Sequence, residues 1–159
     1  MTFDELFDID RPPISEPLEY AVTARGGGGW EPFGAALTRL LERCSLEGLW
    51  WATIDLEDQR TPAYAHLGPD GANRIWTEVS SEAHLPGFVV TPHQVDALRA
   101  LGWSDPLDEE GMQNFHRSWD AADLGAGVAH TLLTLVDVYG FTDDDVVRIL
   151  IEPFETLDN

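Results

Sequence analysis

Histidine and cysteine are too scattered along this sequence to form a recognisable catalytic or metal-binding motif. No histidine pair has the H-E-x-x-H spacing of a zinc protease, and the single cysteine, Cys44, cannot build a thiolate zinc site. Ser80 and Ser81 lie outside the G-x-S-x-G context of a nucleophilic serine. The five histidines are His66, His84, His93, His116 and His130. We therefore expect no metal site and no catalytic residues, and we interpret the protein as a non-enzyme.

Two other runs of residues resemble ligand-binding loops only superficially. Gly26–Gly29 is followed by no G-K-[ST], and all nine cations of the chain are arginines, so a phosphate-loop lysine is excluded. Asp143–Asp145 lacks the alternating ligands and central glycine of a calcium loop. We interpret the first run as a linker and the second as the start of a short helix, and we expect no cofactor.

Aromatic and charged side chains are mixed on one face of three predicted strands. The strands cover about Leu49–Leu56, Ala63–Leu67 and Arg74–Ser80, with turn residues between them. Side chains alternate between the two faces of a strand, so one face collects residues of the types that are enriched in binding hot spots. The candidate partner-binding residues on this face are Trp51, Tyr64, His66, Arg74, Trp76 and Glu78. The competing interpretation is that the long helix or the N-terminal segment covers them as a second core layer.

The opposite face of these strands is small and aliphatic, and we expect helices to cover it. Ile54, Ala65, Ile75 and Val79 belong to this face. Short links between the strands indicate an antiparallel meander. Apolar residues from Phe33 to Cys44 recur at three- and four-residue spacing, which predicts an amphipathic helix ending near residue 48. The predicted fold class is α+β, with helices packed on one face of an antiparallel sheet.

Three further elements follow in the second half of the chain. Thr91 caps a predicted helix, and residues 113–119 suit a fourth strand. Asp120 then begins a long helix that we expect to be mostly buried, followed by a short helix from Asp143. The expected polar stripe of the long helix is His130, Thr131, Thr134 and Asp137.

The chain has 159 residues, which is the length of one globular domain. Residues 1–29 combine prolines, acids and the glycine run, so we predict a flexible arm there and a single folded domain over residues 30–159. One cysteine cannot form an intrachain disulfide, and no signal peptide or membrane span is evident near the N-terminus. A cytoplasmic location is the expectation.

The formal net charge of −20 is concentrated in residues 1–20, 105–123 and 143–159, each with six acids and one arginine. Such clusters repel nucleic acid and anionic membrane surfaces. We expect instead a basic or neutral protein or peptide as the partner, with a homodimer as a second form of association.

Several short motifs resemble a family of actinobacterial domains related to type III secretion chaperones and to YbjN, which are described as peptide-binding and chaperone-like. The matching residues include Tyr64, Glu78-Val79-Ser80, Leu85-Pro86, Leu101-Gly102-Trp103 with Pro106, Asn114-Phe115 and Val138-Tyr139-Gly140. The order of predicted elements is similar to the secretion-chaperone fold.

The resemblance implies a non-catalytic module that holds a segment of another protein, and it transfers no catalytic residues. Two other classes remain open. An acidic immunity or inhibitor protein that blocks one basic enzyme would share the charge and the small size. A small uncharacterised enzyme would require His66, Asp55 and Glu78 to converge in a pocket.

Overall fold

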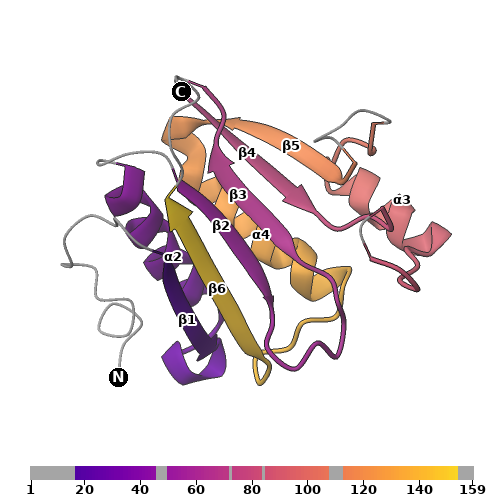
Figure 1. Cartoon of the computed structure of the whole chain (residues 1–159), viewed down its shortest axis with the longest axis horizontal. Helices are drawn as coiled ribbons and strands as arrows, with labels where there is room; N and C mark the ends of the chain where they lie inside the picture. Colours follow the sequence, from indigo (N-terminus) through magenta and orange to yellow (C-terminus); the bar gives the residue numbers. More distant parts are fainter. Residues whose placement is uncertain (1–16, 46–49, 72, 84, 108–112, 154–159) are drawn as a thin grey trace.

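Six strands form one antiparallel sheet in the order β1-β6-β2-β3-β4-β5 in the computed structural model of this chain (Figure 1). The structure describes residues 17–45, 50–71, 73–83, 85–107 and 113–153. The strands are β1 (Leu18–Thr23), β2 (Trp50–Leu56), β3 (Ala65–Pro69), β4 (Arg74–Val79), β5 (Phe115–Asp120) and β6 (Val146–Pro153). The helices are α2 (Trp30–Ser45), α3 (Pro92–Ala100) and α4 (Leu124–Asp137), with short 3-10 turns η1 (Arg25–Gly27) and η2 (Ala121–Asp123). The expected α+β fold with helices on one side of an antiparallel sheet is confirmed.

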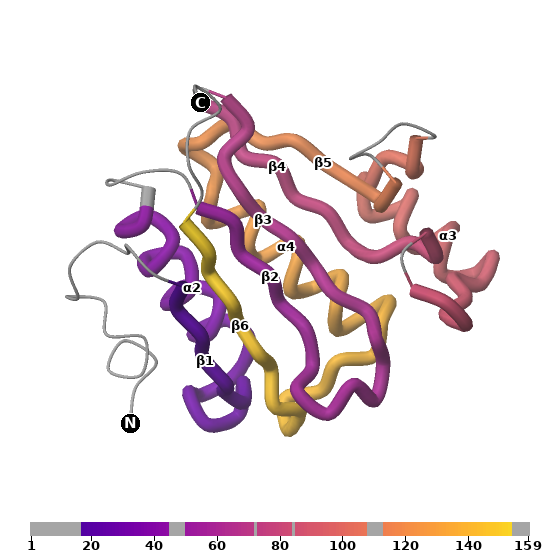
Figure 2. Tube along the Cα trace, viewed as in Figure 1, coloured from indigo at the N-terminus to yellow at the C-terminus, as the bar shows by residue number. Residues whose placement is uncertain are grey.

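Strands β2 to β5 form a meander, whereas the last strand, β6, lies inside the sheet next to the edge strand β1. β6 is inserted between β1 and β2 and pairs antiparallel with both, so segments from the two halves of the sequence lie side by side (Figure 2). The chain reaches β6 through α4, which crosses the back of the sheet beside α2.

Sequence signals account for the helices. The predicted apolar stripe of α2 is buried throughout, from Phe33 to Cys44. The N-cap of α3 is Thr91, whose hydroxyl accepts a hydrogen bond from Gln94 N, while the Gln94 side chain accepts one from Thr91 N. The helix ends before Gly102, whose φ of 92° suits a residue without a Cβ.

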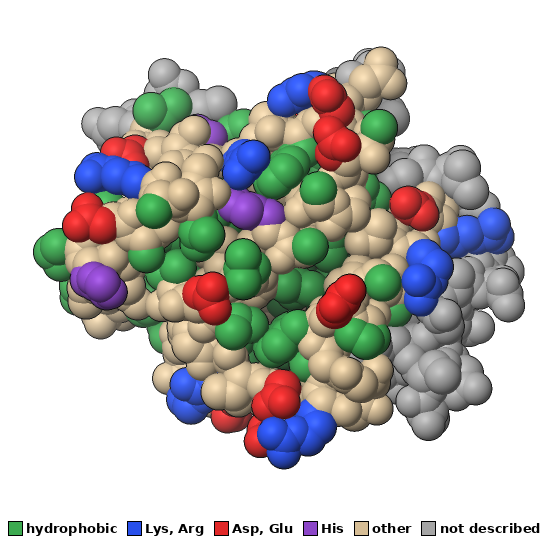
Figure 3. Space-filling view, turned by 180° about the vertical axis from the view of Figure 1, so that it is seen from behind, with side chains coloured by type: hydrophobic (Ala, Val, Ile, Leu, Met, Phe, Trp, Pro, Cys, Tyr) green, Lys and Arg blue, Asp and Glu red, His purple; other side chains and the backbone are tan. Residues whose placement is uncertain are grey.

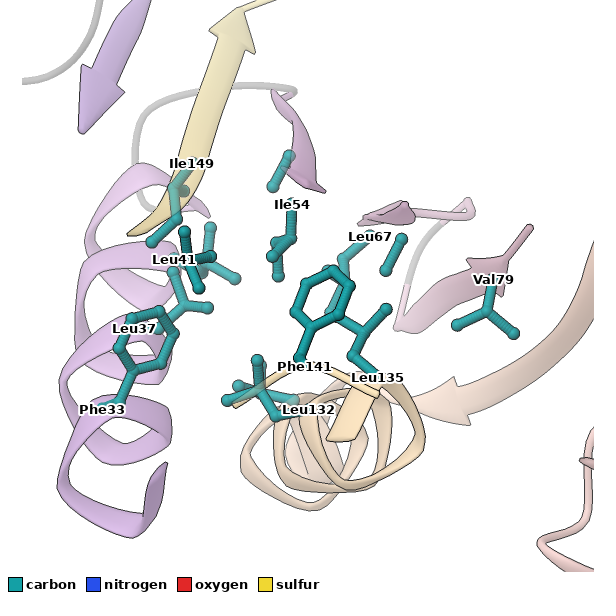
Figure 4. Packing of buried hydrophobic residues seen from close by; sticks show 14 of the residues in the cluster. Phe33, Leu37, Leu41, Ile54, Leu67, Val79, Leu132, Leu135, Phe141 and Ile149 are labelled. Carbon is teal, nitrogen blue, oxygen red and sulfur yellow. The ribbon is translucent and has the colours of Figure 1, made fainter. Parts of the chain in front are cut away.

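The core lies between the helices and the aliphatic face of the sheet. Phe33, Leu37 and Leu41 of α2 and Leu132 and Leu135 of α4 point toward the strands (Figure 4). The strand residues beneath them include Ile54, Ala65, Ile75 and Val79, each at most 5% exposed. The predicted phase of all three central strands is therefore confirmed.

The prediction of an unpacked arm over residues 1–29 is wrong from Leu18 onward. β1 pairs with β6 over its whole length, Val22 and Ala24 are buried, and η1 leads directly into α2. The apolar alternation of Leu18, Tyr20 and Val22 carried this information, but the pattern is weak because it spans only three positions and Val22 alone among them is buried. Residues 1–16 lie outside the described residues.

The short helix predicted from Asp143 is also wrong, because this segment is a turn followed by β6. Val147, Ile149 and Ile151 are fully buried and alternate with polar or half-buried neighbours, which is the pattern of a β-strand. The acids of the turn bind arginines: Asp143 and Asp144 pair with Arg25. Ion pairing in a turn, not helix capping, explains this acidic run.

The polar stripe predicted for α4 is wrong for two of its four residues. Thr131 and Thr134 are fully buried, since their hydroxyls donate to the carbonyls of Gly127 and His130 one turn earlier. The exposed side of α4 carries instead small and apolar residues, including Leu133, which is 46% exposed.

His130 joins α4 to β5 and to the end of α3. Its Nε2 donates to Leu101 O at 2.6 Å, its ring contacts Trp103 and Trp119, and the Arg117 guanidinium lies 3.9 Å from the centre of the Trp119 ring. The other ring nitrogen, Nδ1, is buried and has no hydrogen-bond partner among the described residues. Burial lowers the pKa of His130 and so does nearby Arg117, against the opposing effect of the Leu101 hydrogen bond.

Adjacent leucines on α4 provide a test of the helix orientation. We expect Leu132→Ala to lower the free energy of unfolding by about 2–5 kcal/mol, because Leu132 is 3% exposed and its loss leaves a cavity. Leu133→Ala, the matched control, should cost no more than about 1 kcal/mol. Urea unfolding of both variants measures the difference, and equal losses would contradict the orientation of α4.

The environment of His130 predicts an acid-sensitive contribution to stability. Because the pKa of His130 is lowered in the folded protein, the unfolded chain is protonated more readily below about pH 6.5. The neutral His130 ring therefore contributes fully to the free energy of unfolding above that pH, and this contribution is lost as the pH falls. Acidification from about pH 7.5 to 5.5 should therefore lower the Tm of the parent protein more than that of His130→Gln. Exposed His93 on α3 supplies the control, His93→Gln. Identical acid-induced shifts for parent and His130→Gln would refute the assignment.

Candidate binding face

The face of the sheet opposite the helices carries all six candidate residues. Helices α2 and α4 lie behind the strands (Figure 1), on the side of the aliphatic core, whereas Trp51 and Trp76 alternate with the buried residues of their strands and so lie on the opposite side. Leu132 and Leu135, which could have formed a cover, point into the core instead, and Tyr139 is buried with its hydroxyl donating to Ser80 O just after β4. Covering by the long helix is therefore wrong; the N-terminal segment proposed as the other cover lies partly in residues 1–16, outside the described residues.

Glu78 lies at the centre of this face, in a row of side chains that crosses three strands. The β-ladder places it directly opposite His66 on β3 and His116 on β5. His66 Nδ1 lies 3.1 Å from Glu78 Oε1, and Trp76 Nε1 donates to Glu78 Oε2 at 3.2 Å. One buried carboxylate thus links a histidine and a tryptophan from adjacent strands.

Aromatic rings surround this carboxylate and contact one another. The His66 ring lies 5.2 Å from Trp51 and 4.8 Å from Tyr64, measured between centroids, and His116 stacks on Trp76 at 4.9 Å. We call this set the aromatic platform: Trp51, Tyr64, His66, Trp76 and His116. All five rings are partly exposed, so the platform is a surface that faces solvent on one side.

A glycine allows Trp51 to lie flat on the sheet. A Cβ placed on Gly68 would overlap the six-membered ring of Trp51, so only a residue without a side chain fits beneath it. Gly68 pairs with Trp76 across β3 and β4, which means that Trp51 extends over the strand next to Trp76. The position of the Trp51 ring thus depends on a missing side chain at position 68.

Charged pairs border the platform. Arg74 donates to Asp120 Oδ1 at 2.6 Å and to Ser118, and Arg148 holds Asp55 through two hydrogen bonds of 2.6 and 2.9 Å. Because Asp55 is bound to Arg148, it does not join His66 and Glu78, and the triad required by the enzyme alternative does not form.

Sequence reasoning missed two members of the face. His116 was not assigned to the binding face from the sequence. It lies opposite Glu78 because β5 pairs with β4. Asn114 donates from Nδ2 to the Tyr64 hydroxyl at 3.0 Å and accepts from Ser81 N, so it fixes the edge of the platform. Alternation within β5 was the signal for His116; the Asn114 contact depends on a loop and has no such signal.

A second surface feature lies on the helical side, where α2 and α4 leave an apolar groove of about 580 Å³. Figure 3 shows hydrophobic side chains gathered on this side of the molecule. The groove is lined by Trp30, Glu31, Gly34, Ala35, Thr38, Gly125, Ala129, Leu132, Leu133 and Val136. Its lining contains only one charged residue, Glu31, and the groove was not predicted from the sequence.

In the part of the chain that the structure describes, no three His, Cys, Asp or Glu side chains gather in a way that could hold a metal ion. None of the helices in the same ranges is both long enough and apolar enough to cross a membrane.

Comparison with protein families identifies the class of this domain. Residues 23–149 match the family model TY-Chap3, described as T3SS (YopN, CesT) and YbjN peptide-binding chaperone 3. Because the match spans most of the chain, the protein belongs to this family of peptide-binding chaperones, and the resemblance seen in the sequence is confirmed. Neither the curated proteins nor the solved structures contain a match to the chain.

The position of Trp51 over Gly68 leads to a prediction about the platform. We expect Gly68→Ala to displace the Trp51 ring and to lower the free energy of unfolding by about 1–3 kcal/mol, as added atoms do in a packed region. The indole N–H signal of Trp51 in an NMR spectrum should shift. Gly125→Ala is the control: its Cβ would meet Thr38 at an ordinary 3.6 Å, and it should stabilise α4. An unchanged Trp51 signal in Gly68→Ala would contradict the packing.

Proposed function

We propose that this protein is a non-catalytic, chaperone-like module that holds a segment of a partner protein on the open face of its sheet. The residues that we assign to contact with the partner are Trp51, Tyr64, His66, Arg74, Trp76 and Glu78. The observation that carries the proposal is the aromatic platform, which the helices leave uncovered.

Membership of a peptide-binding chaperone family supports this proposal. The physical properties of the face support it as well, because tryptophan and tyrosine bury large areas with few rotatable bonds and are enriched in binding hot spots. Contacts among the rings and the glycine beneath Trp51 hold the platform in one arrangement before a partner arrives. Such preorganisation reduces the entropy lost on binding.

The acidic character of the chain favours a basic or neutral partner and disfavours nucleic acid and anionic membranes. An inhibitor of one basic enzyme would use the same charge but would bind a folded protein and not a range of peptides. A second copy of this chain is the other occupant to be tested. The cytoplasmic location inferred from the single cysteine stays a prediction.

Peptides selected from a random displayed library on the immobilised full chain provide the test. We expect Trp76→Ala and Trp51→Ala each to weaken the binding of selected peptides by at least about 30-fold, the effect of a hot-spot residue. Because both rings are partly exposed, Tm should fall by only a few degrees, about 1–2 kcal/mol in stability. Titration calorimetry and thermal unfolding measure the two effects.

Leu133→Ala, in the groove on the helical side, serves as the matched control and should leave peptide affinity unchanged. If affinity drops in Leu133→Ala and not in the tryptophan variants, the binding surface is the helical groove and the proposal is wrong. If no peptide is selected, sedimentation of the free chain shows whether a second copy occupies the face instead.

A further inference from the structure

Glu78 differs from the other buried acids of the described chain in the kind of partner it has. Its side chain is 11% exposed, close to Asp145 at 12% and Asp55 at 16%. Asp145 is paired with Arg60 and Asp55 with Arg148, and a guanidinium is permanently charged. Glu78 is paired with His66, which carries charge only when it is protonated, and with the neutral N–H of Trp76.

Burial of a carboxylate that has no permanently charged partner destabilises the folded protein. The carboxylate loses hydration, and only an opposite charge replaces that hydration fully. The arginines of the same face do not meet this need. Arg74 is bound to Asp120 and Ser118, and Arg148 is bound to Asp55. Among the described residues, then, no arginine pairs with Glu78, and a cation from outside would be stabilised there.

The rings around Glu78 favour a flat cation. Trp76 donates to the carboxylate and lies beside it, and the Trp51 ring lies over Gly68, the residue that pairs with Trp76 across β3 and β4. Tryptophan is the side chain that attracts a guanidinium most strongly through its ring face. The chain already shows this geometry on its other side, where Arg117 lies over the ring of Trp119.

We propose that Glu78, Trp76 and Trp51 form a subsite for an arginine side chain of the bound segment. The guanidinium pairs with the Glu78 carboxylate while its plane stacks on an indole ring. Arginine fits better than lysine because it combines a flat, weakly hydrated cation with a fork of parallel N–H donors. This inference rests on the proposed function and names the partner chemistry that the platform selects.

The test uses N-acetyl-arginine methylamide as the probe and its citrulline analogue as a neutral molecule of the same shape. NMR titration of the full chain should show shifts of the Trp51 and Trp76 indole N–H signals with the arginine probe. Affinity for the citrulline probe should be at least about tenfold lower, since a charged hydrogen bond is lost. The lysine analogue should bind between the two. Equal affinity for the arginine and citrulline probes overturns the subsite.

Two variants separate this subsite from general attraction to an acidic protein. Glu78→Gln keeps the shape of the side chain and one acceptor oxygen for the Trp76 N–H, removes the charge, and should abolish the preference for arginine over citrulline. Glu152→Gln removes an exposed carboxylate that lies opposite Trp51 on the same sheet, and should leave the preference intact. If Glu152→Gln reduces the preference as much as Glu78→Gln does, the attraction is non-specific and the inference is wrong.

The selected peptides distinguish this inference from the proposed function. If they bind through Trp51 and Trp76 but tolerate replacement of each arginine by citrulline, the arginine subsite is refuted and the binding face stands. If the arginine probe binds at Glu78 while no peptide binds the chain, the subsite stands and the proposed function is refuted.

Discussion

The two long helices, α2 and α4, lie on the same side of the sheet because the apolar residues of neighbouring strands alternate in one phase. Ile54, Ala65 and Val79 are consecutive partners across β2, β3 and β4, and all three are fully buried. A shift of one strand by one residue would turn its buried set to solvent, so the register is strongly specified. The same constraint places the aromatic and charged residues together on the other face. The open face is thus a direct consequence of how the core is built.

The parts of the fold that could be predicted are those whose burial pattern is local. The amphipathic stripe of α2, the Thr91 cap and the alternation of β2 to β4 all lie within single elements, and each was found in the structure. β6 was mistaken for a helix because its acidic start suited a helix N-terminus, while its role as a central strand depends on β1 and β2, more than ninety residues earlier. The exposure predicted for Thr131 and Thr134 of α4 was wrong for another reason. Their hydroxyls donate to carbonyls of the same helix, so these polar side chains can be buried without losing a hydrogen bond.

The candidate face shows the same division between local pattern and tertiary contact. Alternation placed six residues on one side of the sheet, and this needed only the phase of each strand. The contact of His66 with Glu78, the stacking of His116 on Trp76 and the position of Trp51 over Gly68 depend on how the strands pair. A sequence without its strand register therefore reveals which residues share the face, but not that Glu78 is bound by His66 and Trp76 among the rings of the platform.

The insertion of β6 between β1 and β2 has a consequence for the order in which the protein is made. Thr23 pairs with Val146 and Leu18 with Ile151, so the first strand of the sheet has no neighbour until the last one has left the ribosome. The meander from β2 to β5 can assemble earlier because its pairings join consecutive strands. The hydrogen-bonding edge of β2 that receives β6 therefore stays without this partner until residues 146–153 are made, and pairing of segments so far apart in sequence is the kind of contact that slows folding.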